Sequence, residues 1–293
     1  EYRRQRQMCI RDSRYLDPDQ VRCAWRVRPL TCRYTPISGQ DPSGPIPYDP
    51  HAPIAEQIHQ SFANSLRSLH PDTAVPDVRA VLEDAAGKQK QRDEQLTLRP
   101  LQPVYIDSYL MHSPLTTLEG TVEAWRAMES LVAAGLVRRI GFSNVYDPTI
   151  FGTLFQLARI KPSILQNRWH HSTGHDVSLL SMLSPVLSPN TFPTPPDGVS
   201  PIGVTYQPFW TLTGNTRLRQ SAVVAEIASK YALTPEQVVY AFVHQGMGIP
   251  GLTACVLSGT TNEDHMREAI AATELEPWPE ADIVALRREV YGE

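Results

Sequence analysis

The sequence predicts a parallel α/β fold. From about residue 30 onward, short runs rich in β-branched and aromatic residues alternate with amphipathic stretches at helical spacing. The gaps between these runs are short, and the 293 residues are 41% hydrophobic and 20% charged, which is typical of a chain with a sizeable core. Regular strand–helix alternation with short connections favours either a barrel or a doubly wound sheet.

The first predicted elements lie between residues 29 and 135. A strand at 29–35 is followed by a Pro/Gly loop and then by a helix at 54–69, where apolar residues recur every three or four positions. A second strand is predicted at 104–112, and a second helix at 117–135 has an apolar face that includes Trp125 and Met128. Gly135 suits the C-terminal cap of that helix.

The second half of the chain continues the same alternation. The predicted strands are 136–144, 163–167, 202–210 and 253–261, and the predicted helices are 147–160, 217–231, 234–245 and one that begins near residue 262. Thr234, Pro235 and Gln237 have the residue types of an N-cap, a first-turn proline and a capping-box partner. This stretch is therefore predicted to begin a helix.

Two stretches interrupt the rhythm. Residues 70–103 contain the charge run GKQKQRDEQ, and residues 183–201 are rich in proline and serine. Neither has enough periodic apolar content to enter a core, so both are predicted to be surface insertions or mobile loops. We therefore predict a divergent N-terminal segment at 1–29 and one barrel-like domain at 30–293.

Composition excludes several classes of function. The formal net charge of −4 gives no electrostatic basis for binding nucleic acid or an anionic membrane. The four cysteines form no C-x-x-C pair, which speaks against a disulfide framework or a zinc site. No apolar run is long enough to span a membrane, and the first residues lack the apolar centre of a signal peptide. We predict a cytoplasmic protein that binds a small molecule.

Polar residues follow or close most of the predicted strands. In a parallel barrel the active site lies at the carboxyl ends of the strands, so these residues are the candidates for chemistry. They are Arg33, His112, Ser143 with Asn144, Gln166 with Asn167, Tyr206 with Gln207, and the SGTT stretch at 258–261. Each alone has a structural explanation, such as a bonded core histidine, a turn or a helix cap. Their convergence on one rim favours a site.

Several motifs together resemble the aldo-keto reductase superfamily. They are YIDSYLMHSP, GLVRRIGFSN, KPSILQNRWH, GVTYQPFW and VLSGTTNEDHM, and YTPISGQDP with YQPFWTLTGN is similar to a branch common in fungi. The resemblance covers residues 30–275. It implies a (β/α)8 TIM-type barrel that binds NADPH without a Rossmann motif.

The resemblance also implies roles for individual residues in reducing an aldehyde or ketone by hydride transfer. His112 corresponds to the histidine that orients the carbonyl. Ser143, Asn144 and Gln166 correspond to the residues that hold the nicotinamide carboxamide, and Tyr206 to the aromatic residue that stacks on the nicotinamide ring. Gly259, Thr260 and Thr261 correspond to the phosphate-binding turn after the last strand.

The sequence departs from the family pattern at three places. Arg33 stands at the family lysine; it keeps a positive charge that stabilises an oxyanion but is a poor proton relay. The catalytic aspartate and tyrosine are not identifiable, since Tyr15 lies in the tail and Tyr34 alternates to the opposite face from Arg33. Gly259 and His265 replace the residues that bind the 2′-phosphate, so NADPH is expected and NADH is possible.

Counted by units, the chain begins at the third strand of such a barrel, so we expect the first one or two β/α units to be lacking or divergent. Two rival hypotheses remain open. One is a barrel that binds a cofactor or small molecule without redox turnover, or that acts as an isomerase or cyclase; the other is an inactive fragment. A metal site is not expected at His170, His171 and His175, because they fall in one loop. The substrate, the proton donor and the oligomeric state stay open.

Overall fold

The structure is a computed structural model that describes residues 48–89, 98–189 and 203–292. These residues form two compact units. The N-terminal unit contains residues 48–145 and Thr153–Ile164, and the C-terminal unit contains Tyr146–Gly152 and residues 165–292. Arg33 and the strand predicted at 29–35 lie outside the described residues.

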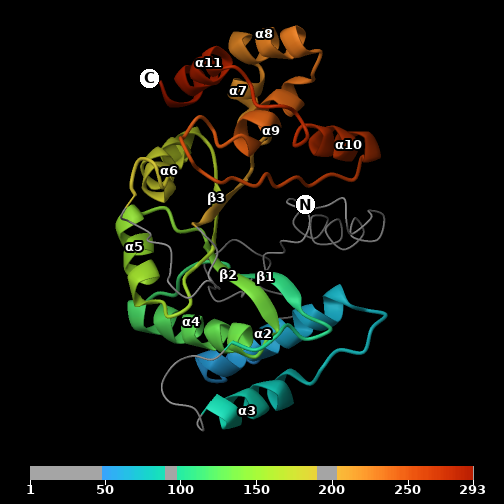
Figure 1. Cartoon of the computed structure of the whole chain (residues 1–293), viewed down its shortest axis with the longest axis vertical. Coiled ribbons are helices and arrows are strands. Elements are labelled where there is room, and N and C mark those ends of the chain that lie inside the picture. Colours follow the sequence, from blue (N-terminus) through green and yellow to red (C-terminus); the bar gives the residue numbers. More distant parts are fainter. Residues whose placement is uncertain (1–47, 90–97, 190–202, 293) are drawn as a thin grey trace. The chain divides into compact units, whose positions relative to one another are not determined.

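The N-terminal unit is built around a β-α-β arrangement. Strands β1 (Ile106–Met111) and β2 (Val137–Ser143) are parallel, with Met111 opposite Phe142, and α4 (Leu118–Ala133) connects them. Helix α2 (Ile54–Leu69) packs against α4 (Figure 1). The sequence-based predictions of these four elements are confirmed.

Local sequence explains where α4 begins and ends. Thr117 caps its start, because its side-chain oxygen accepts from the Gly120 N–H at 3.1 Å. Gly135 follows its end with φ of 74°, and a Cβ there would lie 2.1 Å from the Pro100 carbonyl oxygen, so only glycine fits. The chain can therefore turn directly from α4 into β2.

Helix α3 (Val78–Gln89) lies in the stretch 70–103 that was predicted as an insertion or loop. It contacts α2 and α4, as Figure 1 shows. Arg99 fixes it from outside the helix, since its guanidinium donates both to the Asp84 carboxylate at 2.8 Å and to the Asp84 carbonyl at 2.9 Å. These are tertiary contacts, so apolar periodicity within the segment could not reveal the helix.

The C-terminal unit contains most of β3 and the later elements. Strands β3 (Ile164–Arg168) and β4 (Thr205–Phe209) are neighbours, and the Trp169 N–H donates to the Phe209 carbonyl at 3.0 Å beyond their ends. The helices are α5 (Pro148–Leu157, whose last residues belong to the N-terminal unit), the 3-10 helix η1 (His171–Asp176), α6 (Val177–Leu183), α7 (Thr216–Arg219), α8 (Ala222–Tyr231), α9 (Pro235–His244), α10 (Glu263–Ala271) and α11 (Glu280–Tyr291).

Two predicted elements in this unit are wrong in extent. The strand predicted at 253–261 is reduced to an isolated parallel bridge between Tyr206 and Ala254, where the Tyr206 N–H donates to the Thr253 carbonyl and the Cys255 N–H donates to the Tyr206 carbonyl. The single helix predicted at 217–231 is divided into α7 and α8. The division falls at Ser221, whose hydroxyl oxygen accepts from the Val224 N–H and so begins a new helix.

The capping box predicted for α9 is confirmed. The Thr234 hydroxyl accepts from the Gln237 N–H at 3.2 Å, and the Gln237 side chain accepts from the Thr234 N–H at 3.0 Å. The helix buries six consecutive residues from Val238 to Val243. Within the described ranges, no helix has both the length and the apolar character needed to cross a membrane.

Candidate functional site

Three of the predicted site residues come together at the carboxyl ends of β1 and β2. His112 follows β1, Ser143 ends β2, and Asn144 follows it with φ of 56°. The Asn144 amide donates to the His112 carbonyl at 2.8 Å and to the Ser143 hydroxyl at 3.2 Å. Asparagine tolerates this left-handed conformation, so it can close the turn and join the two strand ends.

A small cavity lies beside this strand end. Its lining includes Tyr48, Gln57 and the two residues that flank His112, namely Met111 and Ser113. The cavity measures about 10 Å³, which is about the space of one water molecule. The Gln57 amide donates to the Pro50 and Ala52 carbonyls, and its Oε1 is buried without a hydrogen-bond partner. Tyr48 is a buried phenol that the sequence analysis did not select.

The C-terminal unit contains a second set of buried polar residues at its strand ends. Gln166 on β3 donates through its amide to the Gln207 side chain on β4 at 3.1 Å, and both side chains are buried. The side-chain amides of the two neighbouring strands therefore satisfy each other, as a buried amide pair requires.

Asp176 is the centre of a buried hydrogen-bonded cluster in this unit. Its Oδ2 accepts from the Tyr206 hydroxyl at 2.8 Å and from the Asn167 amide at 3.0 Å. Burial raises the pKa of the Asp176 carboxyl above its ordinary value, although hydrogen bonds from Tyr206, Asn167 and Thr173 act in the opposite direction. Burial and the neighbouring Asp176 also raise the pKa of Tyr206 well above its ordinary value.

The backbone that presents Asp176 is unusual. Gly174, His175 and Asp176 follow one another with φ of 59°, 49° and 56°, and two of the three are not glycine. His175 is held in this left-handed run by Asn215, whose Oδ1 lies 2.9 Å from the imidazole Nε2. Such conformations cost about 1 kcal/mol or more each, so the buried hydrogen bonds must offset that strain.

The predicted phosphate-binding turn lies on the surface of the same unit. Gly259, Thr261 and His265 are exposed, and Thr260 is half-buried. Asn262 caps α10, since its Oδ1 accepts from the Asp264 N–H at 2.9 Å and the His265 N–H at 3.4 Å. The Thr260 hydroxyl oxygen accepts from the Asn262 N–H at 3.0 Å. Several backbone donors of this helix start are thus already used within the chain.

The charges around α10 also differ from a phosphate-binding pattern. Glu263 and Asp264 lie in its first turn. Arg267 forms ion pairs with both, at 2.6 Å and 3.1 Å. Its positive charge is therefore compensated by two local carboxylates, and the turn has no excess of positive charge.

The predicted site residues thus fall into three groups. His112, Ser143 and Asn144 form one set, Gln166 and Tyr206 lie in the second unit's strand network, and the 259–265 turn lies at α10. Sequence reasoning missed Tyr48, Arg168, Asp176 and Trp210. The only sequence signal for the last three was their closeness to strand ends in RWHHSTGHD and YQPFW.

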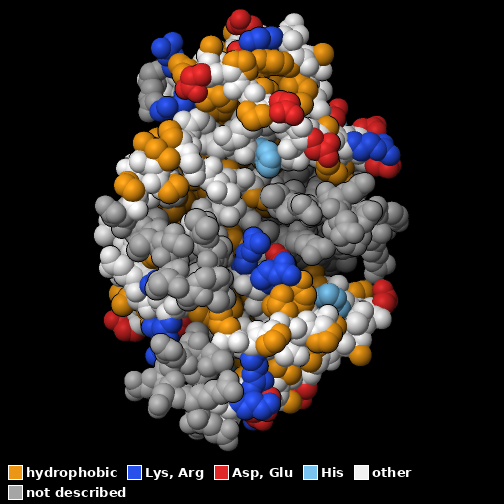
Figure 2. Space-filling view, viewed as in Figure 1, with side chains coloured by type: hydrophobic (Ala, Val, Ile, Leu, Met, Phe, Trp, Pro, Cys, Tyr) orange, Lys and Arg blue, Asp and Glu red, His pale blue; other side chains and the backbone are white. Residues whose placement is uncertain are grey.

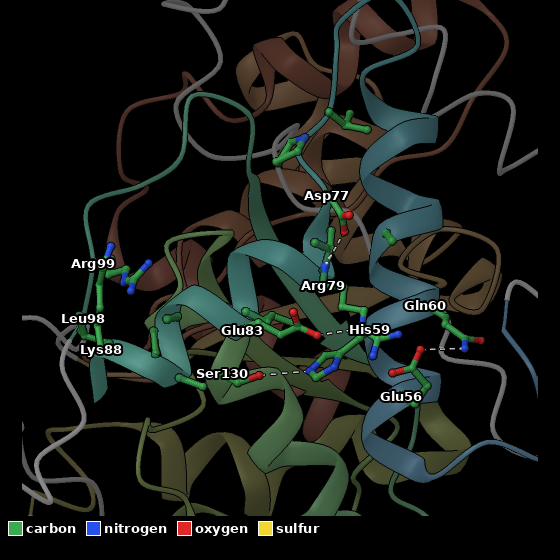
Figure 3. Close-up of a pocket in the computed structure, with 18 of the residues that line it drawn as sticks. Glu56, His59, Gln60, Asp77, Arg79, Glu83, Lys88, Leu98, Arg99 and Ser130 are labelled. Atoms are coloured by element: carbon green, nitrogen blue, oxygen red, sulfur yellow. Dashed lines mark hydrogen bonds and ion pairs between the residues drawn. The ribbon is translucent and has the colours of Figure 1, made fainter. Parts of the chain in front are cut away.

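A large cleft in the N-terminal unit lies between α2, α3 and α4 (Figure 3). Its volume is about 1390 Å³. The His59 Nε2 lies 3.2 Å from the Ser130 hydroxyl, which itself donates to the Ala127 carbonyl at 2.7 Å. Burial lowers the pKa of His59. With its proton directed to a carbonyl, Ser130 is not activated as a nucleophile, so this pair is a bonded structural histidine.

The position of the cleft argues against it as the active site. Its lining includes Pro100 and Ala133, which precede β1 and β2, so this part of the cleft lies at the amino ends of the strands. His112 and Asn144 lie at the opposite, carboxyl ends, where barrel enzymes place their chemistry. On the face shown in Figure 2, positive and negative side chains are interspersed.

The comparisons with known proteins agree with one another on a family. Residues 88–182 match the Aldo/keto reductase family, a range that includes His112, Ser143, Asn144 and Gln166. The chain is 26% identical over 193 residues to Aldo-keto reductase family 1 member A1 of Homo sapiens, and 28% identical over 201 residues to the aldose reductase of Encephalitozoon cuniculi. A plant protein, Aldo-keto reductase family 4 member C11 of Arabidopsis thaliana, is 37% identical over 89 residues. These matches support the aldo-keto reductase superfamily.

Solved structures support the fold. An aldo/keto reductase from Klebsiella pneumoniae in complex with NADP and acetate has a TM-score of 0.52 and 22% identity, and the match covers 80% of this chain and 65% of that one. A second Klebsiella pneumoniae structure, in complex with NADPH, has the same TM-score and 20% identity. The predicted fold class, an α/β fold of the parallel TIM-barrel type, is confirmed, and strands β1 to β4 of the described residues correspond to part of such a barrel.

The alignments cover only part of the length of each matched relative. The alignments use 58% of this chain and 57% of the human protein, and 61% of this chain and 59% of the Encephalitozoon cuniculi protein. The Arabidopsis thaliana match covers 26% of this chain and 28% of that protein. The chain therefore spans less than three fifths of the length of these curated relatives.

Proposed function

We propose that this protein reduces an aldehyde or ketone by hydride transfer from a nicotinamide cofactor, as an oxidoreductase of the aldo-keto reductase type. The observation that carries the proposal is the joining of His112, Ser143 and Asn144 at the carboxyl ends of two parallel strands. These residues lie within the range that matches the family. A fungal-type branch and a cytoplasmic location remain part of the proposal.

The roles are those that the family resemblance implies, and the chemistry of each group supports them. His112 orients the carbonyl, and its position is fixed by the hydrogen bond from Asn144 to its backbone oxygen. Ser143, Asn144 and Gln166 offer hydroxyl and amide groups, which suit the donor and acceptor of a nicotinamide carboxamide. The bound cofactor would supply the hydride, and His112, Ser143 and Asn144 would hold the nicotinamide ring and the carbonyl in reach of each other.

The stacking role of Tyr206 requires a rearrangement. Its ring is fully buried and its hydroxyl donates to Asp176. A nicotinamide ring could stack on it only if the residues that cover the phenol move aside. In this closed arrangement, we propose that Tyr206 positions the end of β4.

Tyr48 is the proton donor in this proposal. It lines the small cavity with Met111 and Ser113, on either side of His112, and a phenol there can protonate the developing alkoxide. Arg33, proposed to stabilise the oxyanion, lies outside the described residues. Tyr48→Phe should lower kcat about 100-fold or more with little change in cofactor affinity. Tyr105→Phe, which removes a half-buried phenol bonded to Arg138, is the matched control.

The α10 region bears on the choice of cofactor. The resemblance predicts NADPH with NADH possible. The carboxylates of Glu263 and Asp264 lie at the helix start that would meet a 2′-phosphate, and they already neutralise Arg267. These residues do not fit a second phosphate well, so we propose that NADH is used at least as well as NADPH.

The experiment is a fluorescence titration of the folded chain with NADPH and NADH, followed by absorbance at the nicotinamide band with a panel of aldehydes and ketones. Binding with turnover that Tyr48→Phe abolishes supports the reductase. Binding without turnover supports the second candidate, a cofactor-binding barrel without redox activity. No binding by folded protein contradicts both.

A further inference from the structure

An arginine and a tryptophan stack at the carboxyl ends of β3 and β4. Arg168 is the last residue of β3, and Trp210 directly follows β4. The guanidinium carbon of Arg168 lies 4.2 Å from the centre of the Trp210 ring and 5.9 Å from that of Phe209. This edge of the strands is where barrel enzymes bind their substrates.

The charge of Arg168 is not neutralised by a neighbouring carboxylate. Among the described residues, no Asp or Glu forms an ion pair with Arg168, whereas Arg126, Arg138, Arg219 and Arg267 each have one. The Arg168 Nε is buried and has no hydrogen-bond partner. A buried donor of this kind is costly unless a ligand supplies the acceptor.

Trp210 is both exposed and strained. The residue is 47% exposed, and its φ of 62° is unfavourable for a residue with a large side chain. Gly214 holds it there by donating to the Trp210 carbonyl at 2.8 Å, and a Cβ on Gly214 would lie only 3.2 Å from the Trp210 and His170 Cβ atoms. Strain that fixes an exposed aromatic face at a strand end is characteristic of a binding residue.

We propose that Arg168 and Trp210 bind the carboxylate-bearing ring of an aromatic substrate, with the guanidinium on the carboxylate and the indole against the ring. The proposed binding depends only on this geometry, whereas any role of the bound ligand as a substrate depends on the proposed function. The carbonyl substrate would then be an aromatic aldehyde or ketone that carries a carboxylate. A guanidinium matches a carboxylate in a bidentate manner, and a ring stacks on an indole with little loss of side-chain freedom.

The same chemistry, a planar ring with an anionic oxygen group, also occurs in a nucleotide. The single positive charge at this site favours a carboxylate over the phosphate of a nucleotide. His170 lies beside Trp210 with 5.9 Å between ring centres, and its Nδ1 accepts from the Ser172 N–H, so this nitrogen is unprotonated. Burial, His171 and Arg168 all lower the pKa of His170. The histidine therefore stays neutral, and a single guanidinium charge matches a carboxylate better than a phosphate dianion.

The test is calorimetric titration of the full chain with benzoate, with benzyl alcohol as the uncharged analogue. Arg168→Gln should weaken benzoate binding about tenfold or more and leave benzyl alcohol unchanged. Trp210→Asn, which keeps a residue that tolerates positive φ, should weaken both ligands. Arg217→Gln, which changes an exposed arginine on α7, is the matched control and should alter neither. Circular dichroism melts verify that each variant is folded.

A turnover experiment separates this inference from the proposed function. With 4-carboxybenzaldehyde, Arg168→Gln should raise KM about tenfold without changing kcat, and with benzaldehyde it should change neither. If the wild-type chain binds benzoate through Arg168 but reduces no aldehyde, the proposed function is wrong and the binding site stands. If folded Arg168→Gln binds benzoate as wild type does, or loses affinity only for adenosine monophosphate, the inference is overturned.

Discussion

The Asp176 cluster and the cleft between α2, α3 and α4 are both built from polar and charged side chains, yet they differ in almost every physical respect. The cluster is closed, and its groups are buried and bonded to one another. The cleft is a hollow of about 1390 Å³, and an ion pair on it, Arg79 with Glu83, has side chains that are 82% and 67% exposed. Size alone would have selected the cleft.

The difference shows that the chemistry of a region depends on desolvation more than on volume. In the cleft, water screens the charges, so the exposed ion pairs contribute little to stability. In the cluster, burial raises the pKa of Asp176 and makes each missing hydrogen bond expensive. We therefore expect substitutions in the two regions to differ sharply in effect.

The largest effect is expected at Asp176. Asp176→Ala removes the acceptor for the Tyr206 hydroxyl and the Asn167 amide and leaves two buried donors without a partner. It should lower the free energy of unfolding by about 3 kcal/mol. Glu83→Ala in the cleft is the matched control and should change it by less than about 0.5 kcal/mol. Urea denaturation measures both, and equal small losses would contradict the comparison.

A second buried carboxylate extends the comparison to the N-terminal unit. Glu129 is 3% exposed, and its Oε1 accepts from the Arg159 and Ile160 N–H groups at 2.7 and 2.9 Å. Glu129→Ala should cost about 2 kcal/mol, because two backbone donors lose their acceptor. Urea denaturation beside Glu83→Ala measures the loss. A cost as small as that of the control would contradict the view that a buried, hydrogen-bonded carboxylate contributes more to stability than an exposed one.

The pKa of Asp176 gives a prediction with a definite sign. Because its folded-state pKa is raised, the protonated form is favoured by folding, and the stability linked to this carboxyl is fully present below its unfolded pKa of about 4. It is lost as the pH rises through the folded-state pKa. Asp176→Asn mimics the neutral form, so it should gain stability relative to wild type as the pH rises from 4 to 7. Paired thermal melts across this range check it, and a difference independent of pH would oppose the assignment.

The smallest effect is expected at the rim of the cleft. Arg99 donates to the Asp84 carboxylate and carbonyl and so attaches α3. Arg99→Gln should lower the free energy of unfolding by about 0.5 kcal/mol and increase hydrogen exchange in α3 without affecting α4. Lys88→Gln removes the other partner of Asp84 and serves as the control. Equal exchange in the two variants would mean that Arg99 does not hold the helix.

The fold was predictable where local sequence decides it. The structure confirms the helices that apolar periodicity predicts at α2 and α4. It also confirms the helix ends that are predicted from the cap residues Thr234 and Gln237 and from Gly135. Helix α3 was missed because Arg99 and the neighbouring helices stabilise it from outside its own sequence. The strand predicted at 253–261 is wrong in extent because a strand depends on pairing with a neighbour, and among the described residues the pairing seen there is the isolated bridge at Ala254.

The candidate site was predictable in part. His112, Ser143 and Asn144 could be selected because parallel strands bring their carboxyl ends together. Asp176 could not, since its two main contacts lie 9 and 30 residues away and depend on a left-handed turn. The stacking of Arg168 on Trp210 likewise depends on the pairing of two strands and on a strained φ that no composition rule signals.

The most direct test of the central claim is transfer of deuterium from a nicotinamide cofactor deuterated at its hydride position to the carbonyl carbon of an aromatic aldehyde, followed by mass spectrometry of the alcohol. The full wild-type chain should give labelled alcohol, and His112→Ala should give it much more slowly while still binding the cofactor. Cofactor binding by folded wild-type protein with no label in any alcohol would contradict the claim that this strand edge performs hydride transfer.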